Sequence, residues 1–367
     1  MTNKDIDLIK MINDPFKGKC GFMPAKIKEK IVIRSGLNEN LAFPEKKMKE
    51  LMKIVAEKID PRIYPEDYSN SLCEVIAKDN NLAENQIVVG NGGDKIIDLM
   101  VRLTIKSGYN AVIINPTYPM YEHAVKVQGG GMTEFLLTSA PDFDLNPNYI
   151  LSNITPKKDR LLFLCSPNNP TGNQFDTKKL ERIITEFPGI VALDETYSDF
   201  GKHSMIPSLH KYPNLIIMKS LSKFHAMAGM RVGYALASDI LISRIRELHP
   251  AFNVNIASLE LAKLVMQEKT ILKKMVEDVV SGREHVFNEL SKIPRITPYR
   301  SYTNFILFKI NDVNAQDVYK KLLQEKGILV RNMSAMPLCE NSLRVSITTM
   351  ENNQDFVHAL LDIMDKI

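Results

Sequence analysis

Short apolar runs in the middle of the chain alternate with segments of helical periodicity. Most of the runs are rich in β-branched residues or leucine and are bounded by Gly, Pro or Asn; they are Gln86–Val89, Ala111–Ile114, Glu134–Leu137, Arg160–Cys165, Ile190–Leu193, Leu215–Met218 and Val232–Leu236. Such runs are typical of strands buried on both faces. Helical patterns separate several of them, as at Lys95–Ile105 and Thr177–Glu186. This alternation predicts an α/β fold around a mostly parallel sheet of seven strands flanked by helices.

The two ends of the chain have different patterns. Lys46–Lys58 places Met48, Leu51 and Val55 on one face, which predicts an amphipathic helix. After residue 255 the pattern predicts a long helix (Ser258–Leu290), a strand (Asn304–Lys309), a helix (Ala315–Glu325), two short strands (Ile328–Arg331 and Ser342–Ile347) and a last helix (Asn353–Met364). We therefore expect an N-terminal arm (1–40), a large domain (41–255) whose first helix packs with the small domain, and a smaller α+β domain (256–367).

Composition narrows the class of protein. A chain of 367 residues fits two domains, and 44% hydrophobic and 25% charged residues are typical of globular proteins. A net charge of +4 over this length does not indicate a nucleic-acid or membrane partner. The N-terminus has acidic residues and no apolar signal core, and no apolar run approaches the roughly 18 residues of a membrane helix. We expect a cytoplasmic protein.

The cysteines and histidines give no sign of a metal site or a disulfide framework. Four cysteines lie far apart without a C-x-x-C pair, and the seven histidines lack the spacing of paired metal ligands. We therefore expect no metal, and small core thiols at Cys20, Cys73, Cys165 and Cys339.

Polar segments follow five of the predicted strands. They are Gly90–Asp94, Asn115–Tyr118, Ser166–Gly172, Asp194–Tyr197 and Lys219–Lys223. Ligands of open α/β sheets bind in the crevice outside the carboxyl ends of the strands. The five segments therefore predict one binding site at that edge of the sheet.

Two of these segments allow several interpretations. Gly92 and Gly93 precede a helix and would let the backbone approach a phosphate, or they form only a tight turn. The dinucleotide fingerprint fails because Lys95 stands at its last glycine. Asp194 could hold magnesium, cap a helix or pair with a ring-nitrogen cation; the phosphate loop that a nucleotide hydrolase needs is missing from the sequence.

Lys223 follows a strand in Ser220-Leu221-Ser222-Lys223. Most lysines are solvated surface groups. At a buried strand end, however, desolvation lowers the lysine pKa and frees the amine to form a Schiff base. The hydroxyls of Ser220 and Ser222 could donate to phosphate oxygens, and Arg231 could clamp the same phosphate.

Together these segments resemble the fold-type I pyridoxal-phosphate aminotransferases. The resemblance rests on Ser220–Lys223 followed by Arg231, on Asn169–Gly172, on Asp194-x-x-Tyr197 and on Arg344, in the family's order and at similar spacing. Ser166–Gly172, Pro116–Tyr118 and Phe252–Asn255 are most similar to the histidinol-phosphate aminotransferase branch.

The resemblance implies a role for each matching residue. Lys223 would bind pyridoxal phosphate and move a proton, Asp194 would pair with the ring nitrogen, and Tyr197 and Asn169 would bond the ring oxygen. Tyr118 would stack on the ring. The cofactor phosphate would be held by Ser220, Ser222, Arg231, the backbone N–H groups of Gly92, Gly93 and Asp94, and Tyr64 from the partner subunit of a homodimer.

The resemblance also implies a substrate end. Arg344 would bind the substrate carboxylate or phosphate, Arg331 would bind substrate phosphate, and Asn40 would contact substrate or cap the next segment. The implied reaction moves an amino group from glutamate, which leaves as 2-oxoglutarate, to a second small molecule, most simply imidazole-acetol phosphate.

Three alternatives remain open at this point. One is an aminotransferase for another amino acid or phosphorylated ketone, and the second is a decarboxylase of the threonine-phosphate type. The third is a cofactor-binding regulator, which usually needs a DNA-binding module that this sequence does not suggest. A shared fold does not decide among them.

Overall fold

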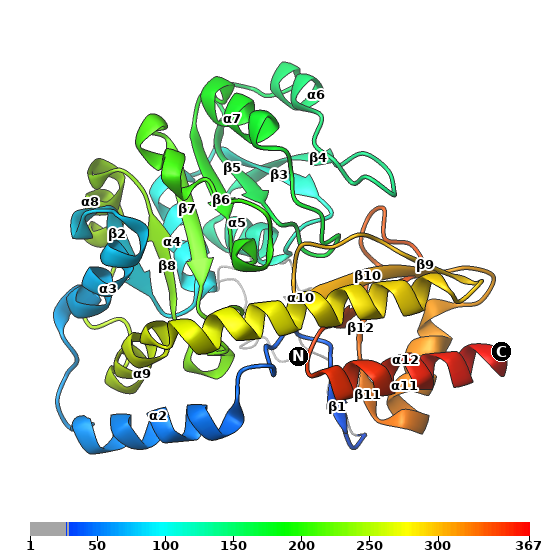
Figure 1. Cartoon of the computed structure of the whole chain (residues 1–367). Helices are drawn as coiled ribbons and strands as arrows, with labels where there is room; N and C mark the ends of the chain where they lie inside the picture. Colours follow the sequence, from blue (N-terminus) through cyan, green and yellow to red (C-terminus); the bar gives the residue numbers. More distant parts are fainter. Residues whose placement is uncertain (1–26, 28) are drawn as a thin grey trace, which may run out of the picture.

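The computed structural model describes residue 27 and residues 29–367. Its main sheet has seven strands in the order β2-β8-β7-β6-β5-β3-β4 (Figure 1). The strands are β2 (Ile87–Gly90), β3 (Asn110–Asn115), β4 (Gly131–Leu136), β5 (Asp159–Cys165), β6 (Ile190–Asp194), β7 (Leu215–Ser220) and β8 (Gly233–Leu236). Strand β8 runs antiparallel to β2 and β7, and the other neighbours are parallel. The predicted α/β class and mostly parallel sheet of seven strands are confirmed.

Helices cover both faces of this sheet. Helices α4 (Gly93–Thr104), α5 (Met120–Gln128) and α8 (Asp239–Glu247) pack on one face, and α7 (Thr177–Glu186) packs on the other. In β3, Ala111 and Ile113 belong to the hydrophobic core on the face of α4, α5 and α8, while Val112 and Ile114 belong to the core on the face of α7. Because both faces are covered, the central strands are continuously apolar, which is why they could be recognised in the sequence.

Strand β4 departs from its predicted limits. It begins at Gly131 rather than at Glu134. It lies at the edge of the sheet, and only Phe135 among its residues is buried. An edge strand with one solvated face mixes polar and apolar residues, so its first half does not form an apolar run.

A second sheet lies beside the first, with the order β12-β13-β10-β9. Its strands are β9 (Ile296–Pro298), β10 (Phe305–Ile310), β12 (Arg331–Asn332) and β13 (Ser342–Ser346). The helices that come after the large sheet in the chain are α9 (Ile256–Gln267), α10 (Lys269–Ser291), α11 (Ala315–Lys326) and α12 (Met350–Asp365). The long helix α10 crosses the molecule beneath the large sheet (Figure 1). This α+β set agrees with the predicted elements of the C-terminal part.

Two predictions in this part were wrong in detail. The single helix predicted over Ser258–Leu290 is two helices, because Glu268 has a non-helical ψ of 49° between α9 and α10. The strand predicted over Ile328–Arg331 is also split, into β11 (Ile328–Leu329) and β12. Strand β11 pairs with β1, whereas β12 pairs with β13, so the chain changes sheets at Val330.

The N-terminal segment joins the C-terminal part of the fold. Strand β1 (Ile33–Arg34) pairs parallel with β11, and α2 (Glu45–Lys58) packs beside α9 (Figure 1). The remaining elements are α3 (Asn70–Asn80), α6 (Pro147–Ser152) and the 3₁₀ turns η1 (Asp67–Ser69), η2 (Glu84–Gln86), η3 (Ser198–Phe200), η4 (Ile206–Lys211) and η5 (Ala228–Met230). The division at residues 40 and 255 stays a prediction, and most of the predicted arm lies outside the described residues.

Cys73, Cys165 and Cys339 are buried free thiols, as predicted, whereas Cys20 lies outside the described residues. Across the described residues, no helix combines the length and the apolar character that crossing a membrane requires.

Candidate active site

A cavity of about 620 Å³ opens where the carboxyl ends of β6 and β7 face β12 and β13. Most residues singled out in the sequence line it: Gly93, Asp94, Tyr118, Asn169, Asp194, Tyr197, Ser220, Ser222, Lys223, Arg231, Arg331 and Arg344. Gly92, Asn40 and Tyr64 are outside this lining. The structure thus brings the polar strand ends together at one edge of the sheet, as their spacing predicted.

Lys223 lies just beyond the end of β7 with its amine inside the cavity. Its Nζ donates to the carbonyl oxygen of Leu37 at 2.8 Å. Burial, reinforced by the positive charge of Arg344, lowers the pKa of Lys223 to about 8. About a tenth of the amine is therefore neutral at pH 7, far more than for a lysine of ordinary pKa, and this neutral form can act as a nucleophile or base.

Lys219 shows that this property is not shared by every buried lysine of the segment. Burial lowers its pKa, but the ion pair with Asp199 at 2.8 Å opposes burial and leaves the pKa raised. Lys219 is thus held as a cation. Of these two lysines, Lys223 is the one suited to covalent chemistry.

Asp194 ends β6 and is only 5% exposed. Its carboxylate accepts hydrogen bonds from the Tyr121 hydroxyl at 2.6 Å and the Thr196 N–H at 2.9 Å. Burial raises its pKa, against the opposing effect of these two donors. A cation in the cavity would favour the charged carboxylate, so the site suits a protonated ring nitrogen.

Tyr121 is a site residue that the sequence analysis missed. Its ring stacks on Phe163 with centroids 4.5 Å apart, and this contact fixes the hydroxyl against Asp194. The available signal was its position one helical turn after Tyr118, at the start of α5. Tyr118 itself lines the cavity and donates to Asp94 at 3.0 Å.

The N-terminus of α4 forms an anion cradle with Arg231. Gly92 has a φ of 84°, and a Cβ there would lie 2.7 Å from an Arg231 nitrogen. Arg231 donates to Asp94 at 3.1 Å. The buried Ser222 hydroxyl has no hydrogen-bond partner among the described residues. A phosphate at this helix N-terminus would meet backbone N–H groups, the Arg231 guanidinium and the Ser222 hydroxyl. The residues present therefore fit a phosphorylated cofactor.

Tyr197 and Asn169 lie between this cradle and the second sheet. Tyr197 is buried, which raises the pKa of its hydroxyl and keeps it protonated. Its ring packs edge-on against Phe305, with centroids 5.2 Å apart. The side-chain oxygen of Asn169 accepts a hydrogen bond from Arg344. These two residues thus connect the two ends of the cavity.

Arg331 and Arg344 form the far end of the cavity. They are directly opposite each other in the antiparallel pair β12–β13. Burial, together with the charge of Arg331, lowers the pKa of Arg344 to about 10. Like charges directly opposite in a sheet are destabilising, so this arrangement suits a bound anion.

One segment crosses the cavity and touches several of these residues; we call it the strap, Gly36–Asn40. The Leu37 carbonyl accepts the hydrogen bond from Lys223, and the Gly36 carbonyl accepts a hydrogen bond from Arg344 at 3.1 Å. Asn38 donates to the Tyr197 hydroxyl at 2.9 Å. Leu37, Asn38 and Glu39 line the cavity, whereas Asn40 donates to the carbonyls of Lys223 and Phe224. The structure therefore places the predicted Asn40 behind Lys223, and its contact with substrate stays a prediction.

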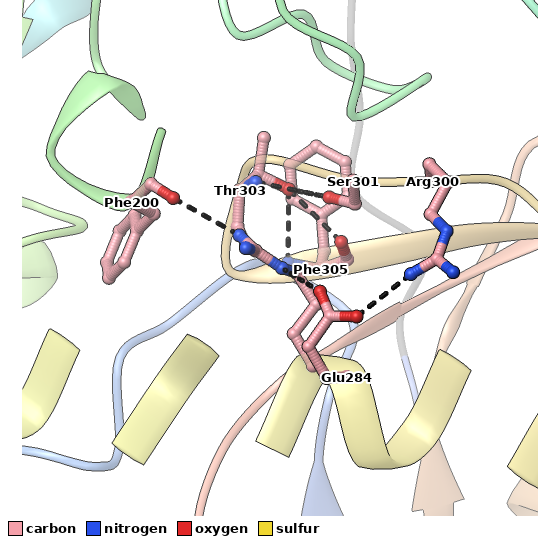
Figure 2. Close-up of polar contacts among 7 residues, drawn as sticks. Phe200, Glu284, Arg300, Ser301, Thr303 and Phe305 are labelled. Carbon is pink, nitrogen blue, oxygen red and sulfur yellow. Dashed lines mark hydrogen bonds and ion pairs between the residues drawn. The ribbon is translucent and has the colours of Figure 1, made fainter. Parts of the chain in front are cut away.

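A buried arginine braces the same region from α10. Arg283 donates to the carbonyls of Phe200 (3.2 Å) and Thr303 (2.9 Å). Figure 2 shows these carbonyls on the turn after Tyr197 and on the loop before Phe305, with Arg300 paired to Glu284 beside them. The Arg344 guanidinium lies 5.0 Å from the centre of the Phe305 ring. Arg283 thus ties α10 to the supports of both Tyr197 and Arg344.

Tyr64 is a predicted residue outside the cavity lining. Its side chain is 77% exposed and stacks on the exposed Phe252 at 5.0 Å between ring centroids. It contributes nothing to the cavity of its own chain.

Comparisons with known proteins show the family of the chain. Residues 30–360 match the family described as aminotransferase class I and II. The histidinol-phosphate aminotransferase of Flavobacterium psychrophilum is 39% identical over 300 residues, which cover 81% of this chain and 85% of that protein.

Solved structures confirm the fold. The histidinol-phosphate aminotransferase of Sinorhizobium meliloti, solved with pyridoxal-5'-phosphate, superimposes with a TM-score of 0.84 at 21% identity, covering 92% of this chain and 91% of that one. The L-threonine-O-3-phosphate decarboxylase of Porphyromonas gingivalis superimposes with a TM-score of 0.79 at 21% identity, and the match covers 91% of this chain and 100% of that one. The fold is therefore common to proteins of different reaction type.

Proposed function

The chain belongs to the aminotransferase class I and II family, and from this premise we propose that it is a pyridoxal-phosphate-dependent histidinol-phosphate aminotransferase. It moves an amino group between glutamate and imidazole-acetol phosphate. The cofactor class is supported by the family match together with the cradle, Asp194 and the low-pKa Lys223 in one cavity. The substrate is supported by the 39% identical relative of that name.

The observation that carries the substrate class is the pair Arg331–Arg344. Both substrates of the proposed reaction carry an anionic group away from the reacting amine: a second carboxylate in glutamate and a phosphate in histidinol phosphate. Two guanidinium groups opposite each other across β12 and β13 suit such anions, because arginine binds carboxylate and phosphate in a bidentate manner. Met333 and Met336 line the same end and offer apolar contact to an imidazole ring.

Each residue of the cavity has its own role in the proposed reaction. Pyridoxal phosphate, when bound, supplies an electron sink for the charge left at the substrate Cα. Lys223 Nζ takes and returns the proton at that carbon as general base and acid. Asp194 keeps the ring nitrogen protonated, Tyr197 and Asn169 hold the ring oxygen, and Tyr118 packs on the ring. Ser220, Ser222, Arg231 and the N-terminus of α4 hold the phosphate.

We further propose a cytoplasmic homodimer in which Tyr64 completes the partner's site. Tyr64, Ile63 and Phe252 are all more than half exposed and none lines the cavity of its own chain. Large exposed apolar side chains grouped in this way favour an interface. The buried free thiols favour a reducing compartment.

The test is an absorption titration of the purified holoenzyme with L-histidinol phosphate. We expect a visible cofactor band that disappears on conversion to the aminated cofactor and returns with 2-oxoglutarate, with glutamate as product. An unchanged band would refute the substrate and leave the cofactor class intact. Carbon dioxide release from threonine phosphate without use of a keto acid would favour the decarboxylase instead. No visible band after addition of pyridoxal phosphate would refute the proposed function as a whole.

A further inference from the structure

Asn38 touches a cofactor-binding residue but has no part in the proposed chemistry. It is 2% exposed, and its Nδ2 lies 2.9 Å from the Tyr197 hydroxyl oxygen. We propose that Asn38 is a positioning residue: it donates to the phenolic oxygen and thereby turns the phenolic proton of Tyr197 toward the cofactor ring. This inference deepens the proposed function and rests on it.

The surroundings of Asn38 determine which end of its amide faces Tyr197. Ser346 Oγ accepts the backbone N–H of Asn38 at 2.9 Å, which leaves its own proton to donate. The Ser346 hydroxyl donates this proton in a hydrogen bond to Asn38 Oδ1, with 3.1 Å between the two oxygens. With Oδ1 occupied by Ser346, the NH₂ group is the end that points at Tyr197.

The backbone of Asn38 is held in place as firmly as its side chain. Its φ of 55° lies in the left-handed region, which Asn and Asp tolerate better than most residues. The buried Asn304 amide donates to the Asn38 carbonyl at 3.1 Å. Three buried contacts from β13 and the loop before β10 therefore fix an amide donor on Tyr197.

The consequence for Tyr197 follows from the chemistry of a hydroxyl. A phenol donates one hydrogen bond and accepts others. Here the oxygen accepts from Asn38, and the proton has no acceptor among the described residues, although the side chain lines the cavity. Accepting a hydrogen bond polarises the O–H bond and strengthens its donation. Asn38 therefore favours donation from Tyr197 to a group in the cavity.

This donation has a measurable effect on the cofactor. A hydrogen bond to the ring oxygen withdraws electron density that would otherwise help to hold a proton on the nitrogen that joins Lys223 to the cofactor. Asn38 thus lowers the pH at which that nitrogen loses its proton. The charged and titratable groups that face Lys223 or Tyr197 are Glu39, Asp94, Tyr118, Cys165, Asp194, Arg231 and Arg344, and all stay unchanged in the comparisons that follow.

The experiment is a pH titration of the visible absorption of the holoenzyme without substrate. Asn38→Gly removes the amide and tolerates the positive φ, and Asn38→Asp keeps the shape but replaces the donor with an acceptor. Asn38→Gly should raise the midpoint by about 0.5–1 pH unit, since one hydrogen bond is lost. Asn38→Asp should raise it further, because the carboxylate both captures the phenolic proton and favours the protonated nitrogen.

The matched control is the same change in a Tyr197→Phe background. Without the phenol, Asn38→Gly should leave the midpoint unchanged. An equal shift in both backgrounds would overturn the proposal, because Asn38 would then act through the shape of the strap. An unshifted midpoint with Tyr197 present would also overturn it, while a normal cofactor band would leave the proposed function standing.

Ser346→Ala is a second variant that tests the proposed role of Asn38. It removes the partner that orients the Asn38 amide and should give a smaller rise, which again requires Tyr197. If Asn38→Gly does not fold, this variant decides: a folded Ser346→Ala protein with an unshifted midpoint contradicts the proposal. Absence of the visible band from the unmodified protein would instead refute the proposed function.

Discussion

The two ends of the cavity are built in different ways. The cofactor end uses side chains at the carboxyl ends of β6 and β7 and just beyond them, together with the N-terminus of α4, which packs on the same sheet. The substrate end combines β12 and β13 of the second sheet with the strap, which lies near the other terminus of the chain. The first follows from the shared edge of strands in one sheet, whereas the second requires segments from both ends of the chain to meet. In the proposed function, the cofactor chemistry depends on the first end and the choice of substrate on the second.

The largest expected effect is at the centre of the cofactor end. Lys223→Ala should reduce turnover by about 10⁴-fold or more, because both the covalent attachment and the proton transfer are lost. The measurement is the glutamate half-reaction followed by absorption. The exposed Lys211 provides the control, and Lys211→Ala should keep full activity. Measurable turnover near the normal rate in Lys223→Ala would contradict the mechanism.

The next effect separates the two arginines of the substrate end. Arg344→Ala should lower kcat/KM by about 100- to 1,000-fold for both substrates, because a buried charged partner of the anion is lost. Arg331→Ala should cost about tenfold for histidinol phosphate and less for glutamate. Steady-state kinetics with each substrate, at saturating cosubstrate, measures the difference. Equal losses for both substrates in Arg331→Ala would remove its role in phosphate recognition.

A smaller effect tests the cradle. Gly92→Ala should weaken cofactor binding by about tenfold, because the new Cβ displaces Arg231. Gly108 is a matched control: its φ of 85° is nearly the same as that of Gly92, yet a Cβ there meets nothing within 4 Å. Gly108→Ala should lose similar stability without a loss of cofactor affinity. Fluorescence titration of the two apoproteins with pyridoxal phosphate measures both affinities, and equal weakening would refute the cradle.

The smallest effect is a pH dependence. Only the neutral amine of Lys223 attacks the cofactor aldehyde, and its pKa lies at about 8 in the free site. The rate of cofactor attachment to the apoprotein should therefore rise about fivefold from pH 7 to pH 8 and level off above pH 9. Stopped-flow absorption at fixed cofactor concentration measures it. A rate that keeps rising tenfold per pH unit to pH 10 would show that the site does not lower the lysine pKa.

The sequence predicted the cofactor end because its residues follow recognisable buried strands. Asp194, Ser222 and Lys223 were found in this way, since the carboxyl ends of parallel strands share one edge. Tyr121 was missed because a tyrosine on an amphipathic helix looks like a packing residue until its contact with Asp194 is seen.

The substrate end could be predicted only through resemblance. Strands β1, β11 and β12 have two residues each, which is too short for any periodicity. The change of sheet at Val330 depends on which partners the flanking residues find. The role proposed for Asn38 likewise requires Ser346 and Tyr197 to meet a segment from the other end of the chain.

The parallel pairing of Ile33 with Ile328 has a consequence for biosynthesis. At typical ribosomal rates, roughly 15 to 60 s pass between the emergence of these two residues. The large sheet is translated in full during that interval, whereas the strap has no strand beside which to settle. A nascent chain that stops short of β11 thus carries both Lys223 and the strap, but the strap is not yet held over the pocket. The pocket is therefore completed among the last events of translation, when β11, β12 and β13 have emerged.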